Sequence, residues 1–465
     1  MERKIDAAIM DWKNDPEHKA LLVKGCRQVG KTYSVESFLK QNYRSFIKVN
    51  LEDEPRSREL FDNKNITGGE IIDRLLFDHP VNMFEGESAI FLDEIQCSSA
   101  AYSSLKGLVS DGRYDIIASG SLLGVKIDDL QRLTPTGYVN IINMKSMDFE
   151  EYLWAMGFRH EDTEYLRSCI SDMKPIDGYV LSAISDQFRR YVAIGGMPAA
   201  VREYSNTHDY SRASSVLRDI LTLLTEDSQK YSKGTDRMKI ERCFQSVPVQ
   251  LGQNNPKFMY SRIEKKKGVG KRTYQPSLLW LKNAGLVEMC TNLTELTSPL
   301  KNHSSEESFK LYLSDTGLMC SMLGGNIGGE IVNHDPYANN GAVMENAVAC
   351  ELVRKGYDLH FYGKPDSTMD IDFIEEIQGK VTALEIKSGR NRKSRSLNQV
   401  FVKNRSVRRA MKLSESNISI DQNGVEHLPL FAVCFLPDAD RMDLRDSVGI
   451  DDVKRRIDEL TCADR

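Results

Sequence analysis

The chain has 465 residues, of which 40% are hydrophobic and 28% are charged. This length exceeds what one compact core supports, so two to four domains are expected, and the composition excludes wholesale disorder. The formal net charge of −5 is small for this length, which excludes a strong overall field toward nucleic acid or membrane and leaves only local patches for such binding.

The nine cysteines are scattered singly, with no CxxC pair and no zinc-binding spacing. This usage predicts buried free thiols in a reducing compartment. Residues 1–18 carry charges throughout, unlike a signal peptide, and no stretch stays apolar long enough to cross a bilayer. We therefore expect a cytoplasmic protein with no membrane partner.

Residues 1–155 alternate helical periodicity with short apolar runs at Ala20–Lys24, Phe46–Leu51, Ala89–Leu92 and Asp115–Ala118. Such alternation is typical of an α/β domain, in which helices join the strands of a largely parallel sheet. The first domain is therefore predicted to be an α/β domain with an open parallel sheet.

A phosphate-binding motif follows the first predicted strand. Residues 25–32 read GCRQVGKT, which fits G-x-x-x-x-G-K-[ST], and a helical pattern follows from Tyr33 to Lys40. The glycines let backbone N–H groups approach phosphate oxygens at a helix N-terminus, Lys31 would reach the β and γ phosphates, and Thr32 would bind Mg²⁺. The alternative is a glycine turn followed by a surface lysine. The predicted ATP site comprises Gly25, Cys26, Arg27, Gln28, Val29, Gly30, Lys31 and Thr32.

Acidic residues end the third predicted strand, where open α/β sheets bind ligands. Asp93 would hold the magnesium through water, and Glu94 would orient and deprotonate the water that attacks the γ-phosphate. The alternative is a solvated charged strand end, which is less favoured because this pair and the phosphate loop occur in the expected order.

Ser119 follows the next strand and could sense the γ-phosphate, although a plain Ser/Gly turn fits the sequence as well. Transition-state charge at such sites is often met by an arginine. The sequence offers several candidates and ranks none of them: Arg113, Arg132, Arg189 and Arg190.

Residues 156–225 have helical spacing and predict a helical lid or connector, and residues 226–300 suggest a winged-helix-like module. In that module we expect helices at Ser261–Lys267 and Lys271–Ala284, separated by a glycine turn. Two wing strands are expected to follow, at Leu286–Met289 and Leu293–Leu296, and then a polar linker at Lys301–Glu307.

The second of these helices would present polar and basic side chains near its N-terminal end, where such helices reach base edges or phosphates. The residues are Lys271, Arg272, Thr273 and Gln275. The local basic patch favours DNA binding. A module used only for packing or protein contacts is an equally good interpretation.

Residues 301–465 begin a further α/β pattern, with a helix at Ala342–Lys355 and strands at Asp370–Glu375 and Val381–Lys387. The pattern E…D…E-x-K in this part is formed by Glu345, Asp372, Glu385 and Lys387. Gathered carboxylates could bind Mg²⁺ and the lysine could support an attacking water, which is phosphodiester hydrolysis. The alternatives are a cross-strand charge pattern and an inactive nuclease-like scaffold.

Several motifs together resemble a prokaryotic family of AAA-type ATPases, and the resemblance covers nearly the whole chain. They are RQVGKT at 27–32, IFLDEIQ at 90–96, SGSLLG at 119–124, DFEEYLWAMG at 148–157, FRRYVAIGGMPAAV at 188–201, LYLSDTGLM at 311–319 and MENAVACEL at 344–352. The resemblance implies an ATPase core, a winged-helix module and a C-terminal domain similar to the PD-(D/E)xK nucleases. Tyr138 departs from the basic residue that many relatives carry after the glycine equivalent to Gly137.

The predicted organisation is a P-loop NTPase core of the AAA type at 1–155, a helical lid at 156–225, a winged-helix-like module at 226–300 and a PD-(D/E)xK nuclease-like domain at 301–465. The favoured function is a Mg²⁺-dependent ATPase that couples nucleotide state to DNA-facing domains. Two alternatives stay open: a nucleotide-dependent DNA- or protein-binding switch with little turnover, and a metal-dependent nuclease controlled by the ATPase. Self-association or a protein partner would fit any of these.

Overall fold

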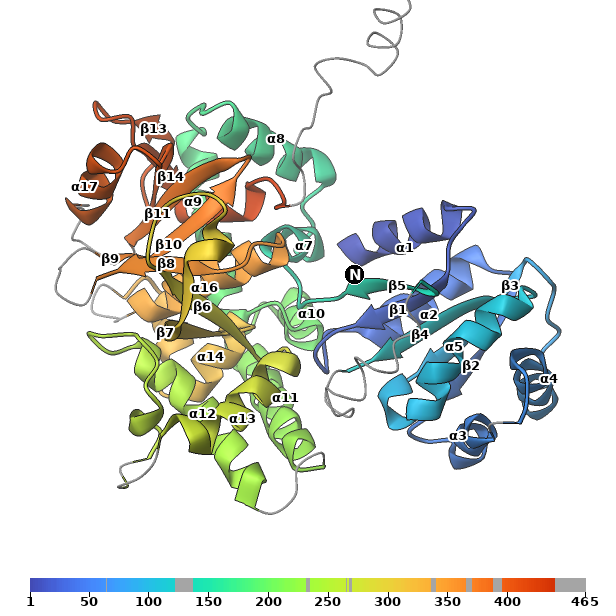
Figure 1. Ribbon diagram of the computed structural model, residues 1–465. Coiled ribbons are helices and arrows are strands. Elements are labelled where there is room, and N and C mark those ends of the chain that lie inside the picture. The colour runs from blue at the N-terminus through green and yellow to red at the C-terminus, as the bar shows by residue number, and fades with distance from the viewer. Residues whose placement is uncertain are drawn as a thin grey trace, which may run out of the picture.

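The protein has two lobes in the computed structural model (Figure 1): an N-terminal lobe of residues 1–143 and a second lobe of residues 144–439. The helix α10 (Pro198–Thr207) of the second lobe lies at their junction, close to the N-terminus of the chain. The structure describes residues 1–63, 65–121, 137–230, 235–264, 266, 270–335, 340–364, 370–387 and 395–439.

The N-terminal lobe contains a five-stranded sheet in the order β2-β3-β4-β1-β5, with every neighbouring pair parallel. The α/β prediction is confirmed, and the predicted strands agree with the observed ones to within two residues. Strands β1 and β3 form at fully apolar runs because both sheet faces are covered by helices. The bounds are β1 Ala20–Lys24, β2 Ser45–Asn50, β3 Ser88–Asp93, β4 Asp115–Gly120 and β5 Val139–Asn143.

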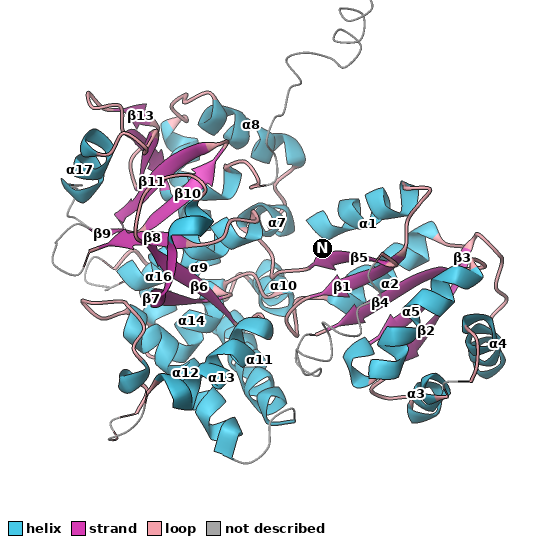
Figure 2. Cartoon of the chain, in the orientation of Figure 1, coloured by secondary structure: helices cyan, strands magenta, loops and turns pink. Residues whose placement is uncertain are grey.

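Helices cover both faces of this sheet, as Figure 2 shows. Helices α1 (Lys4–Asn14) and α2 (Lys31–Asn42) share a core with the face formed by Leu21, Phe91 and their neighbours. The opposite face packs against three helices: α3 (Pro55–Asp62), α4 (Gly68–Asp78) and α5 (Ser99–Asp111). The first of the two cores continues into the second lobe, so the two lobes are joined by apolar packing.

The second lobe begins with helices, as the spacing over residues 156–225 predicted. Asp148 caps α7 by accepting a hydrogen bond from Glu151 N, and Asp177 caps α9 in the same way. The helices are α7 Phe149–Ala155, α8 His160–Ser171, α9 Gly178–Ile194, α10 Pro198–Thr207, α11 Tyr210–Lys230, α12 Thr235–Leu251 and α13 Lys271–Asn283. None of the described helices is long and apolar enough to span a membrane.

The helical pair before the wing differs from the prediction. Helix α13 was predicted correctly, but the helix expected at Ser261–Lys267 is wrong, since the chain makes only a 3₁₀ turn at Tyr260–Arg262. Residues 265 and 267–269 lie outside the described residues. The element that packs against α13 is α12, whose buried Cys243 and Val247 belong to the same core as Tyr274 and Leu278.

The strands that follow α13 are longer than predicted. Residues 287–293 form one strand, β6 (Val287–Leu293), paired antiparallel with β7 (Ser304–Leu313). The pairing of β6 with β7 is irregular between Thr291 and Asn292, in the stretch between the two predicted strands. The predicted linker contains the 3₁₀ turn Leu300–His303 and the start of β7, so the predicted boundary after residue 300 falls inside one strand pair.

The C-terminal part contains α14 (Thr316–Leu323), α15 (Ile327–Val332), α16 (Gly341–Arg354) and α17 (Arg395–Lys403). One sheet has the order β7-β6-β8-β9 and the other β10-β11-β12-β14-β13. The strands are β8 His360–Gly363, β9 Asp370–Ile371, β10 Phe373–Ile377, β11 Lys380–Lys387, β12 Arg409–Ser414, β13 Ser419–Ile420 and β14 Glu426–Pro429.

The strand predicted at Asp370–Glu375 is interrupted at Asp372, which separates β9 from β10. The turn predicted after it is confirmed, because Gln378 and Gly379 have positive φ between the paired strands β10 and β11. The eight cysteines among the described residues are free thiols, as expected for a chain without a disulfide framework.

A tight turn after α9 sets the position of α10 at the lobe junction. Asp315 is fully buried and accepts hydrogen bonds from Gly196 N at 2.8 Å and Gly317 N at 3.0 Å. A Cβ atom at Gly196 would lie 1.9 Å from the Met147 carbonyl oxygen, so the close backbone approach requires glycine at this position.

We expect the substitution Gly196→Ala to destabilise the protein by about 1–3 kcal/mol, because an overpacked site forces backbone shifts. Gly178→Ala serves as the control, since a Cβ at Gly178 has no neighbour within 4 Å and the residue begins α9. The measurement is the midpoint of thermal unfolding of the two variants and the wild type. An unchanged midpoint for Gly196→Ala would show that this turn is more plastic than its packing indicates.

Candidate functional site

The phosphate loop runs from the end of β1 to the first turn of α2. Gln28 and Gly30 have φ angles of 68° and 96°, and a Cβ at Gly25 would lie 2.2 Å from the Met144 carbonyl oxygen. These positions need glycine or tolerate strain, which is typical of loops whose shape is set by function. Strand, loop and helix N-terminus are therefore arranged as the motif predicted.

Lys31 is the first residue of α2 and is 6% exposed. Its Nζ donates hydrogen bonds to the carbonyl oxygens of Gly25, at 3.0 Å, and Cys26, at 2.9 Å. Burial lowers the pKa of Lys31, and the nearby carboxylate of Glu94 opposes this shift. The ammonium thus lies inside the loop, where rotation of the side chain would bring it to a bound phosphate.

The predicted magnesium ligands Thr32 and Asp93 lie in direct contact, at the carboxylate of Asp93. The Thr32 hydroxyl lies 3.1 Å and 3.0 Å from its two oxygens, the Ser119 hydroxyl donates to it, and Lys48 Nζ lies 3.3 Å away. Hydroxyl and carboxylate oxygens are the ligands that Mg²⁺ prefers, so Thr32 and Asp93 fit this ion. Ser119 is fully buried, and its predicted role as a phosphate sensor stays a prediction.

Glu94 follows Asp93 in a left-handed conformation with φ of 53°. Its carboxylate accepts a hydrogen bond from Gln96 Nε2, while Gln96 Oε1 accepts one from Ser121 N at 3.1 Å. A Cβ at Gly120 would lie 2.6 Å from Gln96 Oε1, so glycine permits this approach. Gln96 connects Glu94 to the end of β4, a link that sequence reasoning missed although the residue stands two positions after Glu94.

A cavity of about 420 Å³ opens beside the loop. Its size lies within the range of small-molecule sites. The N-terminal lobe contributes Met1, Arg3, Arg27, Gln28, Gly30, Lys31, Thr32, Tyr33, Ser34, Glu52 and Glu94, and the second lobe contributes Pro198, Ala199 and Arg202 from α10. A ligand in this cavity would therefore contact both lobes.

Arg202 lines this cavity, and it was not among the arginines that the sequence offered. Arg113 pairs with Asp73 and Asp111 away from the loop, and Arg189 pairs with Asp186 and Glu415 inside the second lobe. Arg190 does not line the cavity, and Arg132 lies outside the described residues. Only the fold brings α10 to the phosphate loop, so the sequence contained no signal that ranked Arg202.

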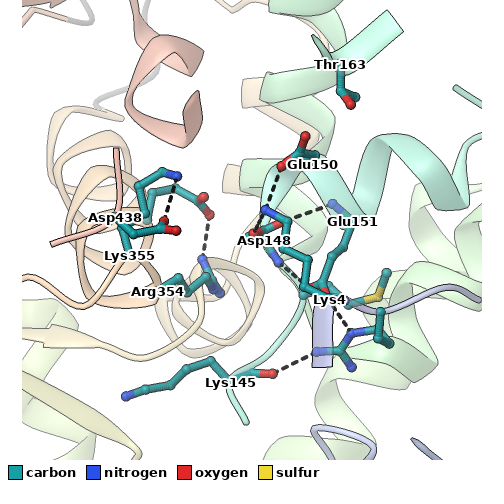
Figure 3. Close-up of polar contacts among 12 residues, drawn as sticks. Lys4, Lys145, Asp148, Glu150, Glu151, Thr163, Arg354, Lys355 and Asp438 are labelled. Atoms are coloured by element: carbon teal, nitrogen blue, oxygen red, sulfur yellow. Dashed lines mark hydrogen bonds and ion pairs between the residues drawn. The ribbon is translucent and has the colours of Figure 1, made fainter. Parts of the chain in front are cut away.

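The N-terminus of α1 ties the phosphate loop to the second lobe. Arg3 donates to the carbonyl oxygens of Val29 and Lys145, both at 2.9 Å, and to Glu151 Oε1 at 3.0 Å. Figure 3 shows Lys4 beside Asp148, Glu150 and Glu151, and its Nζ lies 2.7 Å from Glu150 Oε2. The acidic residues of the DFEEYL segment therefore hold α1 and, through Arg3, the loop.

The four residues of the predicted nuclease pattern lie in the same region, and each has a partner within the protein. Glu345 on α16 binds Lys310 Nζ at 2.8 Å, Glu385 binds Lys387 Nζ at 2.7 Å, and Asp372 accepts from Ile386 N at 2.7 Å. Within the described ranges, no three His, Cys, Asp or Glu residues are placed to hold one metal ion. The metal-binding role of this pattern stays a prediction.

The predicted DNA contacts lie at the start of α13. Lys271 and Arg272 are exposed, Thr273 and Gln275 are half-buried, and Tyr274 is buried against the core. The exposed N-terminal end of the helix thus carries positive charge.

Three domain models match separate parts of the chain. Residues 17–153 match an AAA domain, residues 185–326 match a domain of unknown function (DUF8612) and residues 340–431 match another domain of unknown function (DUF4143). No curated protein matches the chain.

The solved structures that match this chain have low sequence identity to it. The Walker-type ATPase of Pyrococcus abyssi is 13% identical, with 70% of this chain and 96% of that chain covered and a TM-score of 0.44. RuvB of Thermotoga maritima, a Holliday junction branch migration motor, is 13% identical with 65% and 90% covered and a TM-score of 0.26. The Aeropyrum pernix ORC1 protein in complex with DNA is 11% identical with 72% and 91% covered and a TM-score of 0.24.

We expect Arg202→Ala to weaken ATP binding by about 10-fold to 100-fold, because a hydrogen bond to a charged phosphate contributes about 1.5–3 kcal/mol. Arg212→Ala is the matched control, since Arg212 lies on α11, is mostly exposed and pairs with Glu203. Titration with a fluorescent ATP analogue measures both affinities. Equal affinities of the two variants for the ATP analogue would show that Arg202 on α10 does not contact the phosphates.

Proposed function

We propose that the chain binds ATP with Mg²⁺ at the lobe junction and hydrolyses it, since residues 17–153 match an AAA domain. The observation that carries this proposal is the convergence of Thr32, Asp93 and Glu94 beside the cavity that Lys31 and Arg202 line. Loop, metal ligands, base and arginine are the parts that phosphoryl transfer to water requires.

Each polar residue has a distinct task in this proposal. Lys31 leaves the carbonyl oxygens of the loop and binds phosphate oxygens, and Thr32 and Asp93 hold the metal ion, which supplies charge stabilisation at the phosphates. Glu94 accepts a proton from the attacking water. Gln96 orients the Glu94 carboxylate, because its side chain binds both that carboxylate and the backbone N–H of Ser121 at the end of β4.

Nucleotide state is proposed to control how α10, and with it the second lobe, sits against the phosphate loop. ATP and ADP would differ in their contacts with Arg202, because only one of them carries a γ-phosphate. A ligand shifts a conformational equilibrium by its difference in affinity for the two states. The position of α10 in the cavity wall therefore supports coupling between the two lobes.

The second lobe is proposed to face DNA through the N-terminal end of α13. Lys271 and Arg272 are exposed there, next to the antiparallel strands β6 and β7, and α12 supports the helix from behind. Exposed cations at such a helix end suit phosphate contacts in a groove. The alternative is that this surface binds a protein partner. A titration with DNA distinguishes the two uses.

Glu94→Gln is expected to lower the rate of phosphate release by about 10²-fold to 10⁴-fold while ATP still binds, since it removes the base and keeps the shape. The exposed Glu59 on α3 gives the control Glu59→Gln. Steady-state phosphate release, with and without DNA, is the measurement. If the wild type releases phosphate no faster than Glu94→Gln, the protein is a nucleotide-dependent switch with little turnover.

The double variant Lys271→Ala/Arg272→Ala is expected to weaken DNA binding and to lower the salt slope of the affinity by about 2, because each lost phosphate contact removes about one unit. A control with the same loss of charge is Arg159→Ala/Lys174→Ala, at two exposed positions on and beside α8. Titrations over a series of salt concentrations, with ATP and with ADP, measure the effect. Identical slopes for both double variants would exclude α13 as the DNA contact.

A further inference from the structure

Lys310 is a lysine of β7 whose ammonium lies inside the second lobe. Its side chain is 7% exposed, and its Nζ lies 2.8 Å from Glu345 Oε1 and 5.1 Å from the centroid of the Phe361 ring. Lysine is almost never fully buried unless it is paired. This ammonium is therefore held by specific anionic partners from another part of the lobe.

One oxygen of the Glu345 carboxylate is bound by two residues of β7. The Tyr312 hydroxyl donates to the same Oε1 atom at 2.6 Å, two residues along the strand from Lys310. Period-two spacing puts both side chains on one face of β7, toward α16. One carboxylate oxygen thus receives two strong donors, both from this chain.

Asp372 completes the cluster from the break between β9 and β10. Burial and the charge of Glu345 raise the pKa of Asp372 to about 6, while Lys310 and a hydrogen bond from Ile386 N oppose the rise. Burial alone would lower the pKa of Lys310, but Glu345 and Asp372 outweigh this effect and raise it. One ammonium therefore lies close to the charges of two half-buried carboxyl groups.

The remaining pair of the nuclease pattern has its own counter-charge. Glu385 Oε1 binds Lys387 Nζ at 2.7 Å, and Glu385 Oε2 is buried without a hydrogen-bond partner among the described residues. A divalent metal ion is one kind of partner that would satisfy such an oxygen. In this fold, Lys310 supplies positive charge at Glu345 and Asp372 instead.

We propose that Lys310 is the built-in cation of the Glu345–Asp372 cluster, which closes this site to divalent metal ions and removes phosphodiester cleavage from the second lobe. The cluster fastens β7, and with it the strand pair beside α13, to α16. The Lys310 ammonium already lies beside Glu345 Oε1, at the position that a metal ion bound to this oxygen would occupy, and its positive charge repels a second cation. This inference is independent of ATP hydrolysis.

The test uses the full chain without nucleotide. Lys310→Met keeps the length of the side chain and removes its charge, and Lys355→Met is the control, since Lys355 is equally buried but pairs with Asp438 outside the cluster. Calorimetric titration with Mn²⁺ and the Mn²⁺ dependence of the unfolding midpoint are measured. We expect Lys310→Met alone to gain a Mn²⁺ site and to be stabilised by the ion, and Lys310→Met/Asp372→Asn to lose both effects.

A Lys310→Met variant that folds and gains no Mn²⁺ site would overturn the proposal. A second experiment holds even where that variant fails to fold: wild type and Asp372→Asn are incubated with DNA and with RNA in Mg²⁺ or Mn²⁺. Absence of cleavage, or equal cleavage by the two proteins, is the expected result. Cleavage by the wild type that Asp372→Asn lacks would show that the cluster holds a metal ion after all.

Discussion

The guanidinium of Arg3 is the interaction on which the arrangement of the two lobes depends. Its nitrogens bind Val29 O in the phosphate loop, Lys145 O after β5 and the Glu151 carboxylate in α7. Arginine is suited to this task because its planar group presents several donors in a fixed geometry. Because the guanidinium is buried, a movement of the loop away from Arg3 would remove a hydrogen-bond partner from a charged group that is shielded from water. The loop and α7 are thereby mechanically joined.

A second buried network joins the same region to the C-terminal part. Arg354 on α16 binds Ser146, Glu351 and the Tyr191 hydroxyl, and that hydroxyl also donates to Glu351 at 2.6 Å. The segment 144–148 is therefore held on one side by Arg3 and on the other by α16. Buried polar networks have discrete arrangements because partial satisfaction is costly. The segment 144–148 is thus the hydrogen-bonded connection between the cavity beside the phosphate loop and α16.

The sequence predicted those features that are encoded locally. The run Ala89–Leu92 and the acidic pair after it gave β3 and its end, and GCRQVGKT gave the loop, because strand, turn and helix signals lie within a few residues. Arg3 and Glu151 are separated by 148 positions, and no periodicity connects them. The same holds for Arg202 and Lys310, whose surroundings come from other elements. The prediction of a helix at Ser261–Lys267 is wrong because another helix packs against α13. That helix is α12, which precedes residues 261–267 in the chain and supplies the apolar surface.

Hydrogen bonds connect Lys31 to the backbone of the phosphate loop, and the loop to the second lobe. The Lys31 ammonium now satisfies two carbonyl oxygens of the loop, and moving it toward a phosphate would leave those oxygens without a donor. Unsatisfied buried acceptors are costly, so the loop backbone must adjust when the lysine turns. Val29 lies in that backbone and is bound by Arg3, which also binds Glu151. Two hydrogen bonds of Arg3, to Val29 O and to Glu151, therefore connect the loop backbone to α7, and a movement of Lys31 toward a bound phosphate would act on this connection.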